Sequence, residues 1–141
     1  MSRVARLSTR IDEGVARRLE DLSARSETNK SRLAERYIDE GMRMDEHPGI
    51  LFRDGPAGRR AALAGGPDVW EVIDIIRDSD LSGEPAVVHA GEWLDLSSER
   101  VRAAVRYYSH YPDEVDARIE RNRARADMAE ADWRREQAAL A

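Results

Sequence analysis

The chain opens with a segment, residues 3–11, whose side chains alternate between apolar and polar types. A β-strand has a period of two, so alternate residues lie on its opposite faces. One face carries Leu7, Thr9 and Ile11, and the other carries Arg6, Ser8 and Arg10. Since an isolated strand is not stable in water, we expect residues 3–11 to need a partner strand.

Two short amphipathic helices are predicted after this strand. Asp12 is a suitable helix N-cap, and Val15, Leu19 and Leu22 follow it at a helical spacing. The polar residues 26–29 interrupt this apolar stripe. A second stripe over about residues 29–44 consists of Leu33, Ala34, Tyr37, Ile38 and Met42. Residues 3–44 therefore read as strand, helix, turn and helix.

The rest of the chain reads as a hairpin followed by helices. The predicted elements are a hairpin over residues 50–64, a helix capped by Asp68, a helix over 85–93, a helix from Ser97 to Pro112, and a charged helical tail over 113–141. The tail has no glycine or proline, and its heptad-like seam is poor because it includes small and polar residues. It is typical of a helix that packs on a partner surface.

These elements predict a mainly α protein in three parts. Residues 1–45 form the first module, residues 46–112 form a hairpin with three helices, and residues 113–141 form the tail. None of the three predicted cores is large, and small modules of this kind often need a partner chain to be stable.

Composition and hydropathy narrow the class of protein. Hydrophobic residues make up 41% of the chain and charged residues 36%, which is typical of a charge-rich globular protein. Cysteine is absent, so disulfides and thiolate metal sites are excluded. The first eleven residues have no apolar run typical of a signal peptide, and no stretch of about 20 apolar residues follows. We therefore expect a cytoplasmic protein with no membrane contact.

The charge is unevenly distributed along the chain. Residues 1–36 contain nine Arg and Lys against six Asp and Glu, a local charge of +3, whereas the whole chain carries −5. The remaining residues therefore carry −8, because −5 minus +3 is −8. A basic start on an acidic chain indicates nucleic acid as a partner at one end and a different partner at the other.

The opening module resembles the ribbon-helix-helix family in its strand polarity, its helix spacing and its Thr-Arg-Ile-Asp-Glu junction at residues 9–13. In that family, the strands of two chains pair antiparallel, and the resulting ribbon enters the major groove of DNA. The resemblance implies a homodimer or a higher even oligomer on operator DNA. It also implies that the exposed side chains of the ribbon contact bases, here Arg6, Ser8 and Arg10.

The same resemblance implies a second set of DNA contacts. The family holds DNA phosphates at the N-terminus of its second helix, where backbone N–H groups and the helix dipole favour an anion. In this sequence the segment is Thr28, Asn29, Lys30 and Ser31, and the lysine adds a positive charge.

The middle region is similar to a small domain of unknown function that is often attached to antitoxins. The similarity lies in residues 47–50, 58–60, 66–72 and 96–104. Such domains combine a hairpin with a helix-turn-helix, whose second helix would here present Arg100, Arg102 and Arg106 to DNA. The alternative is a compact trihelical module that dimerises or binds a toxin, and the acidic surroundings favour it.

Together the two resemblances imply an antitoxin of a type II toxin–antitoxin system (VapB-like). Its partner would be a PIN-like ribonuclease held by the C-terminal part of the chain. Ile119, Arg123 and Trp133 are the expected toxin contacts, with Trp133 as the anchor because a buried tryptophan often dominates an interface. Alternatively, the tail is a solvated helix that folds back on its own middle domain.

Two further functions remain as alternatives. One is a stand-alone ribbon-helix-helix regulator whose C-terminal domain senses a ligand or mediates oligomerisation, and a ligand-sized apolar pocket in residues 47–111 would favour it. The other is an enzyme, which the sequence does not favour. His47, His89 and His110 show no metal-ligand spacing, and no catalytic motif is present. We expect no cofactor, no metal and no catalytic residue.

Overall fold

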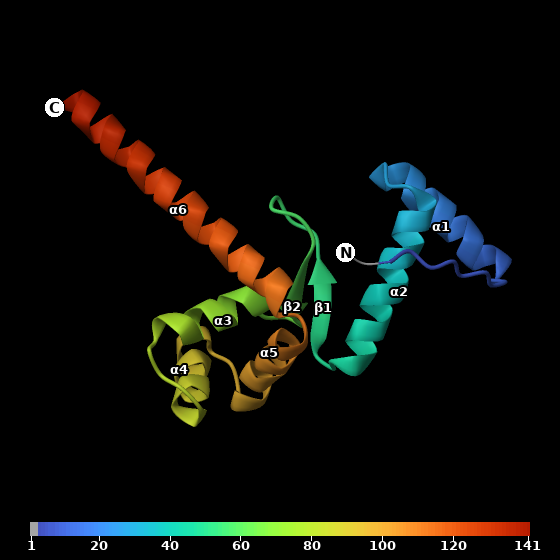
Figure 1. The fold of residues 1–141 in the computed structure, drawn as a ribbon, viewed down its shortest axis with the longest axis horizontal. Helices are drawn as coiled ribbons and strands as arrows, with labels where there is room; N and C mark the ends of the chain where they lie inside the picture. The colour runs from blue at the N-terminus through green and yellow to red at the C-terminus, as the bar shows by residue number, and fades with distance from the viewer. Residues whose placement is uncertain (1–2) are drawn as a thin grey trace. The chain divides into compact units, whose positions relative to one another are not determined.

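The computed structural model describes residues 3–141 and divides into two compact units, Met1–Met42 and Arg43–Ala141. We call them the N-terminal unit and the C-terminal unit. The described residues form six helices and one two-stranded antiparallel sheet, so the predicted mainly α class is confirmed (Figure 1). In residues 3–141, every helix is too short or too polar to cross a bilayer.

The N-terminal unit begins its first helix where the sequence predicts. Helix α1 spans Glu13–Ser26, and the Asp12 carboxylate accepts hydrogen bonds from the backbone N–H groups of Gly14 at 2.9 Å and Val15 at 3.3 Å. The helix ends at Glu27, which takes the left-handed backbone conformation with a φ of 54° and donates its N–H to the Ser23 carbonyl. The predicted N-cap and the predicted break are both present.

Helix α2 spans Lys30–Glu46 and continues into the C-terminal unit. Its first turn is capped by Asn29, whose side-chain oxygen accepts hydrogen bonds from the N–H groups of Ser31 at 2.8 Å and Arg32 at 3.3 Å. The cap satisfies N–H groups that have no partner within the helix.

Residues 3–11 have no regular secondary structure in this single chain. A β-strand is stabilised by backbone hydrogen bonds to a neighbouring strand, and the neighbour expected here belongs to a second copy of the chain. The paired ribbon, and with it the complete ribbon-helix-helix arrangement, stays a prediction.

The C-terminal unit begins with the predicted hairpin. Strand β1 (Ile50–Arg53) pairs antiparallel with β2 (Arg60–Leu63), so that Ile50 lies opposite Leu63 and Arg53 opposite Arg60. Four helices follow, namely α3 (Val69–Asp78), α4 (Glu84–Leu94), α5 (Ser98–His110) and α6 (Pro112–Leu140).

The predicted caps begin two of these helices. The Glu71 carboxylate accepts a hydrogen bond from the Asp68 N–H at 2.8 Å at the start of α3, and the Ser97 hydroxyl accepts one from the Arg100 N–H at 3.3 Å at the start of α5.

The core of the C-terminal unit lies between the hairpin and helices α3 to α6. Tyr107 is completely buried in it, and its hydroxyl accepts a hydrogen bond from Arg43 at 2.8 Å and donates one to Glu114 at 3.2 Å. The other large side chains that are fully buried in this core are aliphatic: Leu63, Val69, Val72, Val101 and Ile119.

The start of α6 departs from the prediction of a separate tail over residues 113–141. Val115 and Ile119 are buried in the core of the C-terminal unit, so the chain has no boundary between units at residue 112. Residues 120–141 are exposed throughout, and Figure 1 shows this part of α6 projecting away from α3, α4 and α5. The first turns of α6 therefore fold back on the C-terminal unit, as one of the two alternatives predicts, and the rest of the helix projects away from it.

Candidate dimer and nucleic-acid interface

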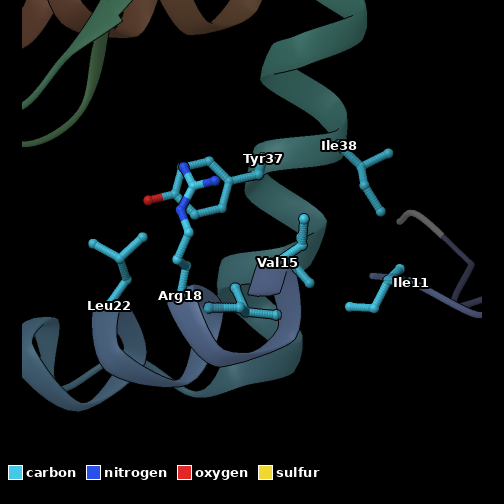
Figure 2. A pocket seen from close by; sticks show the side chains of 8 residues that line it. Ile11, Val15, Arg18, Leu22, Tyr37 and Ile38 are labelled. Atoms are coloured by element: carbon cyan, nitrogen blue, oxygen red, sulfur yellow. The ribbon is translucent and has the colours of Figure 1, made fainter. Parts of the chain in front are cut away.

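An apolar groove of about 410 Å³ runs between the two helices of the N-terminal unit. Figure 2 shows side chains that line it, which come from α1, from α2 and from Ile11 before α1; Tyr37 lies on the side of Arg18, and Ile38 lies on the side of Ile11. The lining residues are Ile11, Val15, Arg18, Leu19, Leu22, Ala34, Tyr37 and Ile38. All but Arg18 and Ile11 belong to the two apolar stripes predicted from the sequence.

The groove leaves much of this apolar surface in contact with water. Ile11 is 53% exposed, Val15 48% and Ile38 47%. None of the residues of α1, all of which the structure describes, is buried. A helix with an apolar face gains stability by burying that face against another element, and the groove leaves this face uncovered in the single chain.

The predicted base-contacting residues precede Ile11 in the sequence, and Ile11 is the first residue of the chain that lines this groove. Arg6, Ser8 and Arg10 are exposed, as is every residue from 3 to 11, so their exposure does not test their predicted role. Leu7 on the opposite set of positions is also exposed, and Ile11 lines the groove. The last residue of the alternating segment, Ile11, thus contributes to the apolar surface of the same unit.

The predicted phosphate site at the start of α2 is partly occupied by the chain itself. The Asn29 side chain already accepts from the Ser31 N–H, and the Thr28 N–H donates to the Ser23 carbonyl at 3.3 Å. Lys30 is exposed, with its Nζ 3.4 Å from a carboxylate oxygen of Glu20. A phosphate contact at the start of α2 would therefore depend on the charge of Lys30 and on the hydroxyl groups of Thr28 and Ser31 more than on free backbone N–H groups.

No protein-family model, no curated protein and no solved structure gives a significant match to this chain. Within residues 3–141, no group of three or more His, Asp or Glu side chains is arranged to hold a metal ion. The groove and the charged side chains beside it are therefore the features that indicate a function for the N-terminal unit.

Helix α5, the candidate recognition helix, uses two of its three arginines inside the C-terminal unit. The Arg100 guanidinium donates to the Ala64 carbonyl, and Arg102 forms an ion pair with Glu84. Arg106 is exposed. These contacts favour the interpretation of this region as a compact packing module over a second DNA-reading helix.

The predicted toxin contacts fall in different environments on α6. Ile119 is only 1% exposed and belongs to the core of its own unit, so its side chain is not at a surface that a partner can reach. Arg123 forms ion pairs with Asp74 at 2.8 Å and Asp78 at 3.2 Å on α3. Trp133 is 58% exposed on the projecting part of the helix. The expectation for Ile119 is therefore corrected, because the apolar stripe of α6 is used internally there.

The fold also brings together two histidines that the sequence leaves 63 positions apart. Nδ1 of His110 lies 3.1 Å from Nε2 of His47, and His47 is only 4% exposed. Burial lowers the pKa of His47, and the charges of His110, Arg106 and Arg43 lower it further, while Glu46 opposes them. No spacing pattern signals this pair, because both residues lie at the ends of helices that meet only in the folded unit.

Proposed function

We propose that this chain is a DNA-binding repressor that dimerises through its N-terminal unit as a ribbon-helix-helix protein and acts as an antitoxin. The observation that carries the proposal is the open apolar groove between α1 and α2. It supports the proposal because it is half of a core whose other half is a second copy of the same unit.

The segment before α1 supports a second copy as the occupant. Its alternating side chains end at Ile11, which lines the groove. Pairing residues 3–11 with the same residues of another chain places Leu7 and Ile11 on the side that faces the helices. It also places Arg6 and Arg10 on the side that faces away, where guanidinium groups can donate two hydrogen bonds to a guanine edge.

The charge distribution supports DNA as the ligand of such a dimer. Residues 1–36 carry +3, and a dimer brings two such segments to one surface. Base contacts from Arg6, Ser8 and Arg10 would give sequence preference, and Thr28, Asn29, Lys30 and Ser31 would hold the backbone at the start of α2.

The projecting part of α6 supports a protein partner at the other end of the chain. Met128, Trp133 and Leu140 are large apolar residues exposed along it. Exposed tryptophan on a long helix with charged neighbours is suited to a partner groove, in which the aromatic ring becomes the anchor. For an antitoxin the partner is a toxin, and we propose a PIN-like ribonuclease.

The dimer and DNA part of the proposal is tested with the purified full-length chain. Light scattering after gel filtration should give the mass of a dimer or a higher even oligomer, and a mobility-shift titration should detect selective binding to a palindrome upstream of its own gene. A monomer that binds no DNA selectively would contradict the proposal.

The antitoxin part is tested by co-expression with the product of the adjacent gene. A stable complex, and loss of that product's ribonuclease activity within it, is the expected result. Dimerisation and DNA binding without such a partner would instead favour the alternative, a stand-alone regulator with a ligand-sensing C-terminal domain. The C-terminal unit has a pocket, but arginines line it and it extends along α6 as far as Arg125, so it is not the apolar pocket within residues 47–111 that would favour this alternative.

A further inference from the structure

A pocket of about 280 Å³ lies in the C-terminal unit beside the turn of the hairpin and the first half of α6. Four arginines, one carboxylate and one tryptophan line it: Arg60, Arg118, Arg121, Arg125, Asp68 and Trp70. The proposed DNA-binding and toxin-binding roles use none of these as a set. Their charge and geometry define the class of ligand that the pocket fits.

Helix α6 places three of the arginines on one face. Arg118, Arg121 and Arg125 follow each other at three- and four-residue steps, which align side chains along a helix. Arg118 lies between the buried residues Val115 and Ile119, whereas Arg121 and Arg125 lie just beyond them in the exposed part of the helix. The ion pairs of Arg123 with Asp74 and Asp78 on α3 hold this next turn of the helix beside the unit.

The positive charge of the pocket is only partly compensated. Arg60 forms an ion pair with Asp68, which also accepts a hydrogen bond from the Trp70 indole N–H at 3.2 Å. Arg118 donates to two backbone carbonyls, Ala57 at 2.7 Å and Arg59 at 3.2 Å, and these carry no charge.

The other two arginines of the pocket, Arg121 and Arg125, add positive charge that no carboxylate of residues 3–141 neutralises. Among the described residues, Arg121 and Arg125 have no carboxylate within ion-pair distance. Four guanidinium groups against one carboxylate leave three positive charges around the pocket. The pKa of Arg118 is lowered by burial and then by the like charges of Arg121, Arg60 and Arg125, while the Asp68 charge opposes them, so the four arginines repel one another.

A bound anion would relieve this repulsion. The arrangement of the arginines and Trp70 indicates which kind of anion fits. Guanidinium groups bind phosphate oxygens through paired N–H donors, so a cluster of three suits a phosphoryl group. The Trp70 ring provides an apolar wall on which a heterocyclic base can stack. The pocket volume lies near the lower limit of roughly 300 Å³ for small-molecule sites, which fits one nucleotide unit and not a duplex.

We propose that this pocket binds a free nucleotide, with its phosphates on Arg118, Arg121 and Arg125 and its base against Trp70. The site lies entirely within the C-terminal unit, so the proposal requires neither DNA binding nor a toxin. A nucleotide strand could offer the same phosphate chemistry, and the test below separates the two sources.

The test is isothermal titration calorimetry on the full-length protein. The probes are ATP, ADP, AMP, adenosine, inorganic phosphate, pyrophosphate and a short single-stranded oligonucleotide. The expected order is ATP tighter than AMP, pyrophosphate weaker than ATP, and adenosine without measurable binding. The double variant Arg121→Gln/Arg125→Gln should weaken ATP binding at least tenfold, because it removes two of the three uncompensated charges. Both positions are exposed on a helix, and glutamine is a good helix former, so the fold is retained.

A matched control and a second readout complete the test. Arg134→Gln/Arg135→Gln removes the same charge from the same helix outside the pocket and should leave ATP affinity unchanged. Trp93→Phe/Trp133→Phe leaves Trp70 as the only tryptophan, and its fluorescence should be quenched as ATP binds.

Three results would overturn the proposal. One is the absence of binding by every mononucleotide at millimolar concentration. Another is equal loss of ATP affinity in the pocket variant and the control variant, which would indicate nonspecific charge attraction. The third is binding of the oligonucleotide alone, lost in Arg121→Gln/Arg125→Gln, which would assign the pocket to a nucleic-acid strand.

Discussion

Arg10 shows how one exposed side chain can be tied to a function by its neighbours in the chain. It lies between Ile11, which lines the apolar groove, and Thr9, and two residues before the helix cap Asp12. Because a strand directs adjacent side chains to opposite faces, a ribbon that packs Ile11 on the helices must direct Arg10 outward. The position of Ile11 in the groove therefore supports a DNA-facing role for Arg10 in the dimer.

Replacing Arg10 by alanine is expected to weaken specific operator binding by about 1–3 kcal/mol, because a bidentate contact to guanine is lost. The dimer should stay intact, since Arg10 does not line the groove. A mobility-shift titration at fixed salt measures the loss, with Arg17→Ala on α1 as the matched control. Equal operator affinity in the Arg10 variant and the parent would count against the strand assignment.

His47 gives the C-terminal unit a stability that depends on pH. Its lowered pKa means that the folded state binds fewer protons than the unfolded state between that pKa and the ordinary value of about 6.5. The stabilisation from neutral His47 is complete above the ordinary value and is lost as the pH falls through the lowered one. Thermal unfolding should therefore show a falling Tm on acidification from neutral pH, and His47→Gln should reduce that fall.

The control for this prediction is His89→Gln, a half-buried histidine on α4. The two variants each lack one histidine and have the same carboxylates, so a difference between their Tm profiles on acidification is due to the site of His47. Indistinguishable Tm profiles for His47→Gln and the parent would show that the buried pair does not set this dependence.

At the scale of elements, the sequence predicts local structure well and long-range contacts poorly. Asp12 and Ser97 begin helices because a cap acts over three residues, and both positions are read directly from the chain. The burial of Ile119 and the meeting of His47 with His110 depend on how helices pack, and no local spacing encodes that. The predicted strand over residues 3–11 is a third kind of case: these residues have no regular secondary structure in the single chain, and the strand expected to pair with them belongs to another chain.

The groove between α1 and α2 gives an element-scale prediction. Ile38→Glu is expected to raise the dimer dissociation constant on the order of 100-fold or more, because an unpaired carboxylate would be buried in the shared core. Val88→Glu places the same charge at a comparably exposed apolar residue of the C-terminal unit and should leave the dimer unchanged. Sedimentation equilibrium measures both constants. A dimer that tolerates Ile38→Glu as well as Val88→Glu would remove the groove from the interface.

At the scale of the whole molecule, the two ends of α6 differ in role: the first turns pack in the core, and the rest of the helix is exposed. Its first turns complete the core of the C-terminal unit through Val115 and Ile119, whereas residues 120–141 are exposed. One continuous helix therefore joins a structural part to the proposed partner-binding part. The two parts can be separated by the position of a truncation.

A chain ending at residue 126 is expected to keep its fold, its dimer and its operator binding, and to lose the complex with the toxin. It retains both buried residues of α6 and removes Met128, Trp133 and Leu140, the large apolar residues exposed beyond this point. A chain ending at residue 113 should instead unfold the C-terminal unit. Losing the burial of Val115 and Ile119 costs about 3–6 kcal/mol, which is comparable with the whole stability of a small domain. Circular dichroism melts and pull-down with the adjacent gene product distinguish the two truncations, and toxin binding by the chain ending at residue 126 would move the partner surface to another part of the molecule.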